Sequence, residues 1–176
     1  LTLDNSPVFQ SQVVDWIRVQ REAGIGVGLV CTVEDEARFR ADVEEALVRH
    51  DVSYVTLPQR GLLRNLMSGA RALRRFNRRH PSRTIYARGI WGSLCHFLAY
   101  PRRRPPLLYD FRGDVVSEAE SRGRSSARTL ILKLLTTFAI RRASRLVCIS
   151  DQAAGFLRDN HNRPDNRDRI KACAAG

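Results

Sequence analysis

Residues 107–118 read Leu-Leu-Tyr-Asp-Phe-Arg-Gly-Asp-Val-Val-Ser-Glu, an apolar start that opens into charged side chains. The first three residues predict a short buried strand. Asp110, Arg112 and Gly113 come next, and Glu118 stands eight residues after the first carboxylate. In an open α/β sheet, ligands bind in the crevice outside the carboxyl ends of the strands. The stretch therefore predicts a charged site at a strand end, where glycine lets the backbone turn sharply or approach a ligand closely.

Strand-like and helix-like segments alternate on both sides of this stretch. The strand-like segments are residues 1–4, 25–32, 52–57, 84–87, 107–109, 145–149 and 169–173, and the helix-like segments are residues 9–23, 34–50, 62–79, 91–100, 125–142 and 151–158. Strands that alternate with helices through short loops imply a mostly parallel sheet with right-handed crossovers. We therefore expect a three-layer α/β/α fold with a mostly parallel sheet of about six to seven strands.

Size and hydropathy limit the possible classes of protein. The chain has 176 residues, enough for one domain with a sizeable core and a little short for two. It contains no run of about 18 uninterrupted apolar residues, so a membrane-spanning helix is not expected. The first 20 residues lack the basic start and apolar centre of a signal peptide. These features predict a cytoplasmic protein.

The cysteines and histidines form no recognisable catalytic or metal-binding set. Cys31, Cys95, Cys148 and Cys173 are widely separated, with no Cys-x-x-Cys pair. Metal sites use clustered ligands at characteristic spacings, so we expect no metal and interpret the cysteines as small buried side chains in a reducing compartment. The histidines are dispersed and no Gly-x-Ser-x-Gly elbow occurs, which disfavours Ser-His-Asp hydrolysis. His96 lies in an apolar helical segment and is expected to be structural.

The net charge of +12 comes from one part of the chain. Residues 52–109 contain 12 arginines and no lysine, aspartate or glutamate, whereas the remainder has 18 basic and 18 acidic residues. One interpretation is a solvated arginine face, and another is docking of residues 60–104 on an anionic membrane, at roughly 1 kcal/mol per charge. Nucleic-acid binding would need interleaved aromatic or base-reading residues, or a known module, and neither is evident. We therefore expect no nucleic-acid partner.

The predicted helix over residues 62–79 is amphipathic. The side chains expected to face the core are Leu63, Leu66, Met67, Ala70 and Leu73, which recur at helical spacing. Arginines recur on another face. Because the core needs the apolar face, contact of this helix with a membrane would be peripheral, without insertion.

Two further loops are expected to reach the same edge of the sheet. Ser6, Pro7 and Val8 follow the first strand, and Arg88 and Gly89 follow the fourth. Neither of the two glycine-rich phosphate-loop motifs occurs in the chain. Arg88 and Gly89 form either an anion contact or a turn with a solvated arginine. The charged residues after residue 109 similarly form either a ligand site or an ion pair that fixes the loop.

Several passages, in their order along the chain, carry a family resemblance. They are Ser6–Val13, Ala23-Gly24, the pattern Asp110-Phe111-Arg112-Gly113 with Glu118, Leu146–Ser150 and Arg169–Ala174. With them, nearly the whole chain resembles the N-terminal Rossmann-like half of a GT-B glycosyltransferase, of the large retaining group called glycosyltransferase family 4. The pattern Asp-x-Arg-Gly-x4-Glu resembles that of some members.

The resemblance implies two Rossmann-like domains that face a cleft. Residues 1–172 would be the acceptor-binding domain and residues 173–176 the start of the linker, and the donor-binding C-terminal domain would be absent from this chain. The nucleotide-sugar donor would therefore bind only in the full-length enzyme. No cofactor and no metal are expected in this domain, and a retaining hexosyl-type transferase is implied whose isolated half is inactive.

The resemblance also implies roles for individual residues. Asp110, Arg112 and Glu118 would lie near the reacting sugar or the acceptor. The remaining cleft residues would be Ser6, Pro7, Val8 and Phe9 in the first loop, together with Arg88, Gly89, Gly113 and Ser150, the last also suited to be a helix N-cap. The chain departs from many members in two places, with Asn5-Ser6-Pro7 in place of a Gly-Gly loop and Asp110–Arg112 in place of a histidine.

The expected function is transfer of a sugar from a nucleotide-sugar donor to a cell-envelope or lipid-linked glycan acceptor. Family members often act at the cytoplasmic face of the membrane, which agrees with the membrane interpretation of residues 60–104. The expected partners are therefore the missing C-terminal domain, the acceptor and an anionic membrane surface. The alternative is a standalone α/β binding module whose basic face contacts an anionic membrane or nucleic acid.

Overall fold

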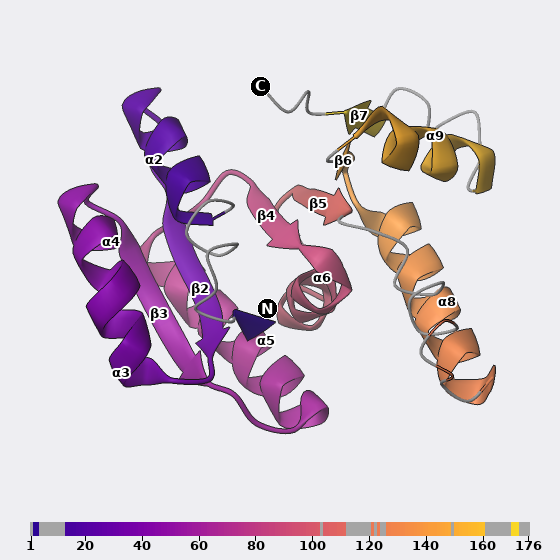
Figure 1. Cartoon of the computed structure of the whole chain (residues 1–176), viewed down its shortest axis with the longest axis horizontal. Coiled ribbons are helices and arrows are strands. Elements are labelled where there is room, and N and C mark those ends of the chain that lie inside the picture. The colour runs from indigo at the N-terminus through magenta and orange to yellow at the C-terminus, as the bar shows by residue number, and fades with distance from the viewer. Residues whose placement is uncertain are drawn as a thin grey trace. The chain divides into compact units, whose positions relative to one another are not determined.

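The computed structural model describes residues 2–3, 13–102, 104–111, 121, 123, 126–148, 150–160 and 170–172. The chain divides into two compact units, Leu1–Pro81 and Ser82–Gly176, and each is described by itself (Figure 1). Every described strand pairs in parallel with its neighbours.

The first unit contains a three-stranded sheet in the order β1-β2-β3. Its strands are β1 (Thr2–Leu3), β2 (Gly28–Val33) and β3 (Ser53–Pro58), and its helices are α2 (Asp15–Glu22), α3 (Glu36–Phe39), the π-helical η2 (Arg40–Glu44), α4 (Glu45–Arg49) and α5 (Leu62–Arg79). Local signals set the helix ends. Asp35 accepts a 3.0 Å hydrogen bond from the backbone N–H of Arg38 at the start of α3, and Gly24 follows α2 with a φ of 77°.

Helices cover both faces of this sheet. One face is buried against α2, α3, η2 and α4 in a core made of Val14, Ile17, Cys31, Val33, Phe39, Val43, Leu47 and Val52. Successive strand residues point to opposite faces, so Gly28 turns away from the core face that Leu29 and Cys31 share. On that other face, a Cβ on Gly28 would stand 2.6 Å from the Phe76 ring of α5. Glycine at this position therefore lets α5 pack closely on the sheet.

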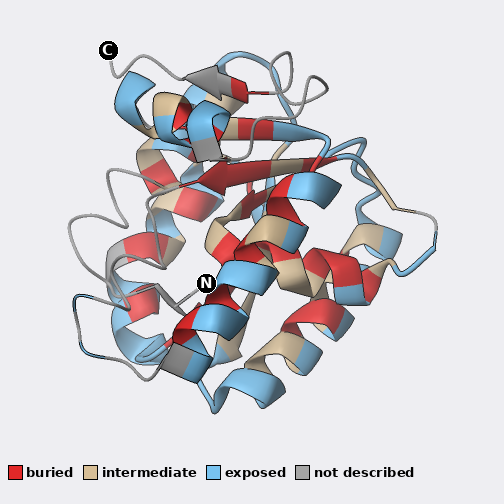
Figure 2. Ribbon diagram, turned by 90° about the vertical axis from the view of Figure 1, so that its right-hand side faces the viewer, coloured by how far each residue is buried: buried red, intermediate tan, exposed pale blue. Residues whose placement is uncertain are grey.

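The second unit contains a four-stranded sheet in the order β4-β5-β6-β7. Its strands are β4 (Ile85–Arg88), β5 (Leu107–Phe111), β6 (Arg145–Cys148) and β7 (Ile170–Ala172), and its helices are α6 (Gly89–Ala99), α8 (Ser126–Arg142) and α9 (Asp151–Asn160). Buried residues follow the strands and one side of each helix, as Figure 2 shows. Tyr109, Ile140, Leu146 and Leu157 are among the fully buried side chains of this unit.

The parallel α/β architecture predicted from the alternation is confirmed. The prediction of one sheet with about six to seven strands is wrong, because the described strands form two hydrogen-bonded sheets, one of three strands and one of four. Several local predictions are wrong. β2 begins at Gly28 and not at residue 25. β5 continues to Phe111, because that apolar side chain extends the buried pattern past Asp110, and α6 begins at Gly89 with no intervening loop. In α5, Leu63 and Met67 are 77% and 47% exposed instead of facing the core.

The three described cysteines are free thiols, with Cys31 and Cys148 buried. Burial raises the pKa of the Cys31 thiol to about 12, so it packs as a neutral side chain. Within the described ranges, no three His, Cys, Asp or Glu side chains gather where a metal ion could bind. In the same part of the chain, no helix is long and apolar enough to cross a membrane.

Candidate active site

The carboxyl ends of β4, β5 and β6 lie along one edge of the second sheet, because parallel strands all point the same way. The pairing register places Asp110 beside Arg88 on one side and beside Val147 on the other. Residues in register on neighbouring strands point to the same face at a strand spacing of about 4.8 Å. The side chains of Asp110 and Arg88 are therefore attached to neighbouring positions on the same face of the sheet. We call this edge of the second sheet, at the carboxyl ends of β4, β5 and β6, the carboxyl edge.

Asp110 is 0% exposed, whereas Arg88 is half-buried. Burying an ionised carboxylate is costly unless opposite charge and hydrogen bonds compensate. Arg88 is the basic residue that the register brings next to it. Burial, with a smaller contribution from Asp110, raises the pKa of the Tyr109 phenol. The carboxylate is thus held inside a strand, where packing fixes its position better than a loop would.

Gly89 connects β4 directly to α6. Its φ is 70°, in the left-handed region that favours glycine, while a Cβ there would meet no atom within 4 Å. Backbone conformation, and not crowding, therefore requires glycine. The first N–H groups of an α-helix lack intrahelical partners and attract anions. Arg88 and the start of α6 together give the carboxyl edge a positive end next to the carboxylate of Asp110.

Ser150 lies immediately before α9, at the same end of the sheet. Its Oγ accepts a 3.2 Å hydrogen bond from the backbone N–H of Ala153, so the predicted N-cap is confirmed. The residue is exposed. Since its hydroxyl oxygen already satisfies a helix donor, the role that the structure gives Ser150 is to start α9. Contact of Ser150 with a ligand stays a prediction.

The structure thus brings Arg88, Gly89 and Asp110 together and puts Ser150 on the same edge. The other predicted site residues lie outside the described residues: Ser6, Pro7, Val8, Phe9, Arg112, Gly113 and Glu118. A guanidinium group and a helix N-terminus, set beside a buried carboxylate, can bind and orient polar groups of a ligand. They can also stabilise charge that develops during a reaction, because the groups are already in place.

His96 of α6 is a core residue and is 0% exposed. Its Nε2 lies 3.1 Å from the carbonyl oxygen of Pro105. A carbonyl can only accept, so Nε2 carries the proton in the neutral ring. Burial lowers the pKa of His96, the bond to Pro105 opposes that shift and nearby Arg104 adds to it. The structural role predicted for this histidine fits these contacts.

Two sets of arginines in the first unit differ in their partners. Those on α2, η2 and α4 pair with carboxylates, in the pairs Arg18–Glu22, Arg21–Asp51, Arg40–Glu36 and Arg49–Glu45. The helix α5 instead carries six exposed arginines, at positions 64, 71, 74, 75, 78 and 79. No carboxylate among the described residues forms an ion pair with any of the six. The sequence indicated the charge excess, and the structure places much of it on one helix.

Comparisons with known proteins agree with this architecture. A family profile described as a glycosyl transferase 4-like domain matches residues 10–172. Among solved structures, a protein described as a UDP-N-acetylglucosamine 2-epimerase from Listeria monocytogenes is similar in fold, with a TM-score of 0.62 and 11% sequence identity. The match covers 96% of this chain and 43% of that chain, so the present chain spans less than half of its length. A comparison with curated protein sequences finds no match.

Proposed function

We propose, since this chain belongs to the glycosyl transferase 4-like domain family, that it forms the acceptor-side half of a glycosyltransferase. The observation that carries the proposal is the family match over residues 10–172. The carboxyl edge supports it, because Arg88, Gly89 and Asp110 meet where an α/β sheet binds ligands. The carboxyl edge would then be one wall of a cleft, and a second domain would supply the other.

The proposed reaction is transfer of a hexosyl group from a nucleotide sugar to a glycan or lipid-linked acceptor, with retention. The donor would bind to the second domain, so the present half would be inactive alone and would itself need neither cofactor nor metal. The reaction develops positive charge on the sugar and negative charge on the leaving diphosphate. Fixed charges in a site from which water is excluded stabilise such a transition state.

The residues proposed to lie near the reacting sugar or acceptor are Asp110, Arg112 and Glu118. The carboxylate of Asp110 is fully buried, so its proposed part is to hold Arg88 in position at the carboxyl edge. For Arg112, the test is Arg112→Ala in the full-length protein. Near-normal turnover by a correctly folded variant would leave this residue with a structural role alone.

The proposed location is the cytoplasmic face of the membrane, with peripheral contact. The support is the helix α5, whose six exposed arginines have no ion-pair partner among the described carboxylates. Such charges are attracted to anionic lipid headgroups. The same observation favours the second candidate function, a standalone module that binds anionic surfaces through this helix, with nucleic acid as the other possible polyanion.

One experiment separates the two candidates. The full-length protein is offered a panel of UDP- and GDP-activated hexoses with a membrane lipid extract, and release of nucleoside diphosphate is measured. The transferase proposal expects release that depends on both the donor and the extract, and none from residues 1–176 alone. Absence of turnover with every donor, together with salt-sensitive vesicle binding, would favour the binding module.

A further inference from the structure

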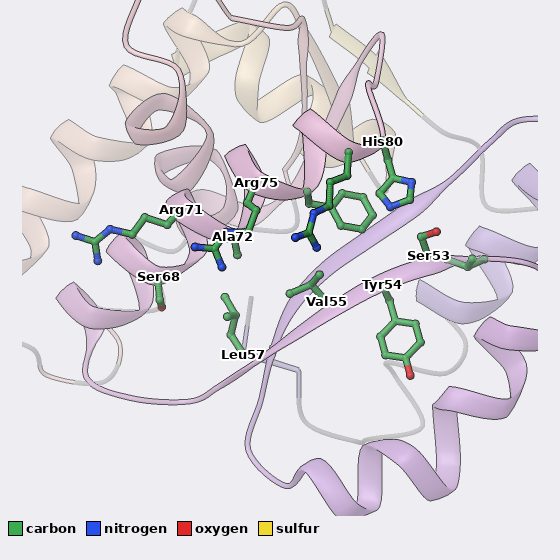
Figure 3. Close-up of a pocket in the computed structure, with 12 residues that line it drawn as sticks. Ser53, Tyr54, Val55, Leu57, Ser68, Arg71, Ala72, Arg75 and His80 are labelled. Carbon is green, nitrogen blue, oxygen red and sulfur yellow. The ribbon is translucent and has the colours of Figure 1, made fainter.

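An open groove of about 650 Å³ lies in the first unit between β3 and α5 (Figure 3). Val55 and Leu57 line it from β3, and Phe76 lines it from α5, so its floor is apolar. Arg71, Arg75 and Arg79 line it from the helix. Its volume falls in the range of ligand sites, about 300–1,000 Å³. We call it the β3–α5 groove, and it shares no residue with the carboxyl edge.

The three arginines form a row along one side of the β3–α5 groove. They are spaced by four residues, and a helix rises 1.5 Å per residue, so successive members stand about 6 Å apart along the axis. All three are exposed and none forms an ion pair with a described carboxylate. No acidic residue lines the groove. A ligand there would meet uncompensated positive charge above an apolar floor.

The other side of the β3–α5 groove is an open strand edge. Among the described strands, β3 pairs only with β2. Gln59 donates its N–H to the carbonyl oxygen of Val33 at 2.9 Å. The backbone N–H and C=O groups of the odd-numbered residues of β3 therefore point to β2. The backbone groups of Tyr54 and Thr56 therefore turn to the open edge. Pro58 also turns its backbone to the open edge, but it has no N–H to donate.

We propose that the β3–α5 groove binds an extended acidic peptide segment of another protein, which adds to β3 as a strand. Alternate residues of a strand stand about 6.6 Å apart on one face, close to the spacing of Arg71, Arg75 and Arg79. Carboxylates at every second position would each meet one guanidinium group. The peptide backbone would pair with Tyr54 and Thr56, as in other cases of strand addition.

The geometry favours a peptide over a lipid surface. A membrane surface would contact only the outermost charged side chains of the helix, and it would form no backbone hydrogen bonds with a strand edge. Here the arginine row and the open edge border the same groove, about five strand residues long. Figure 3 shows Arg71 and Arg75 on the helix side, opposite Ser53, Val55 and Leu57 along β3. A single extended chain can use both sides at once.

The test measures fluorescence anisotropy of a labelled heptapeptide that alternates glutamate and threonine, beginning and ending with glutamate. Loss of three partly exposed ion pairs predicts that R71S/R75S/R79S weakens binding by about tenfold. The matched variant R64S/R74S/R78S removes the same charge from the same helix outside the groove lining, and should stay within about threefold of the wild type. Equal weakening by both variants would contradict the proposal.

A second arm tests the strand ladder. In a strand, residues with side chains on one face all direct their N–H groups to one edge. N-methylation of either all glutamates or all threonines should therefore abolish binding, while methylation of the other set leaves it intact. A peptide of the same composition with its glutamates contiguous should bind at least about tenfold more weakly. Equal binding of all these peptides would show charge attraction alone and overturn the proposal.

A third arm uses vesicles of phosphatidylglycerol and phosphatidylcholine. If R71S/R75S/R79S lost vesicle binding while R64S/R74S/R78S kept it, and the alternating peptide bound neither protein, the groove would be a lipid site. The proposal expects the alternating peptide to bind, and to bind less well to the groove variant. These readouts do not depend on sugar transfer, so they stand apart from the proposed enzyme activity.

Discussion

Among single residues, His96 makes the stability of the second unit depend on pH. Burial lowers its pKa, so the unfolded chain, with a value near 6.5, takes up a proton before the folded chain does. The free energy of unfolding should therefore have its highest value above pH 6.5 and should decrease as the pH drops below 6.5. Urea unfolding at pH 7.5 and 5.5 checks this. His96→Gln should reduce the difference between the two pH values, and an undiminished difference in that variant would contradict this role of the buried ring.

Gly28 is the second residue whose substitution should change the stability of the protein. A Cβ there would stand 2.6 Å from the Phe76 ring, so Gly28→Ala should lower the free energy of unfolding by about 1–3 kcal/mol. Gly26→Ala is the control, because a Cβ at that position meets nothing within 4 Å. Chemical denaturation measures both. Equal stability of the two variants would mean that α5 does not pack on Gly28.

Among the helices and strands, the start of α9 gives the clearest test. Ser150→Ala removes the acceptor for the N–H of Ala153 and should cost about 1 kcal/mol of stability. Ser150→Asp restores an acceptor and adds a favourable charge at a helix N-terminus, so it should recover the loss. Thermal unfolding compares the three proteins. A destabilised Ser150→Asp would contradict a capping role.

The alternation of apolar segments predicted most helices and strands, because periodicity reports which face is buried. It failed where tertiary packing decides. Phe111 extends β5 because it is buried beyond Asp110, and a run interrupted by a charge does not show this. Leu63 and Met67 follow helical spacing yet are exposed near the start of α5, whereas the buried residues of this helix, Gly69, Ala70 and Phe76, come later along it.

At the scale of the whole molecule, the charge excess predicts salt-dependent attraction to membranes. Anionic vesicles should retain the protein at low salt and release it near 0.5 M, because salt screens exposed charges. Neutral vesicles should retain little at any salt concentration. Sedimentation with vesicles measures the bound fraction. Equal retention by neutral and anionic vesicles would argue against α5 as a docking face.

The sequence predicted the site only in part. Arg88, Gly89 and Asp110 were expected at strand ends, and the parallel register explains why they meet. The pairing of Asp110 with Arg88 across strands could not be predicted, because register depends on long-range contacts. The β3–α5 groove was also missed, since spacing along one helix does not reveal the open edge of a strand far away in the sequence.

Turnover of Asp110→Asn in the full-length protein tests whether the carboxyl edge is the acceptor wall of a transferase. Loss of the carboxylate should lower sugar transfer at least about tenfold, with the thermal midpoint recorded to confirm folding. Asp159→Asn, an equivalent change at an exposed position of α9, should leave transfer unchanged. Wild-type turnover by a folded Asp110→Asn protein would show that the carboxyl edge takes no part in sugar transfer.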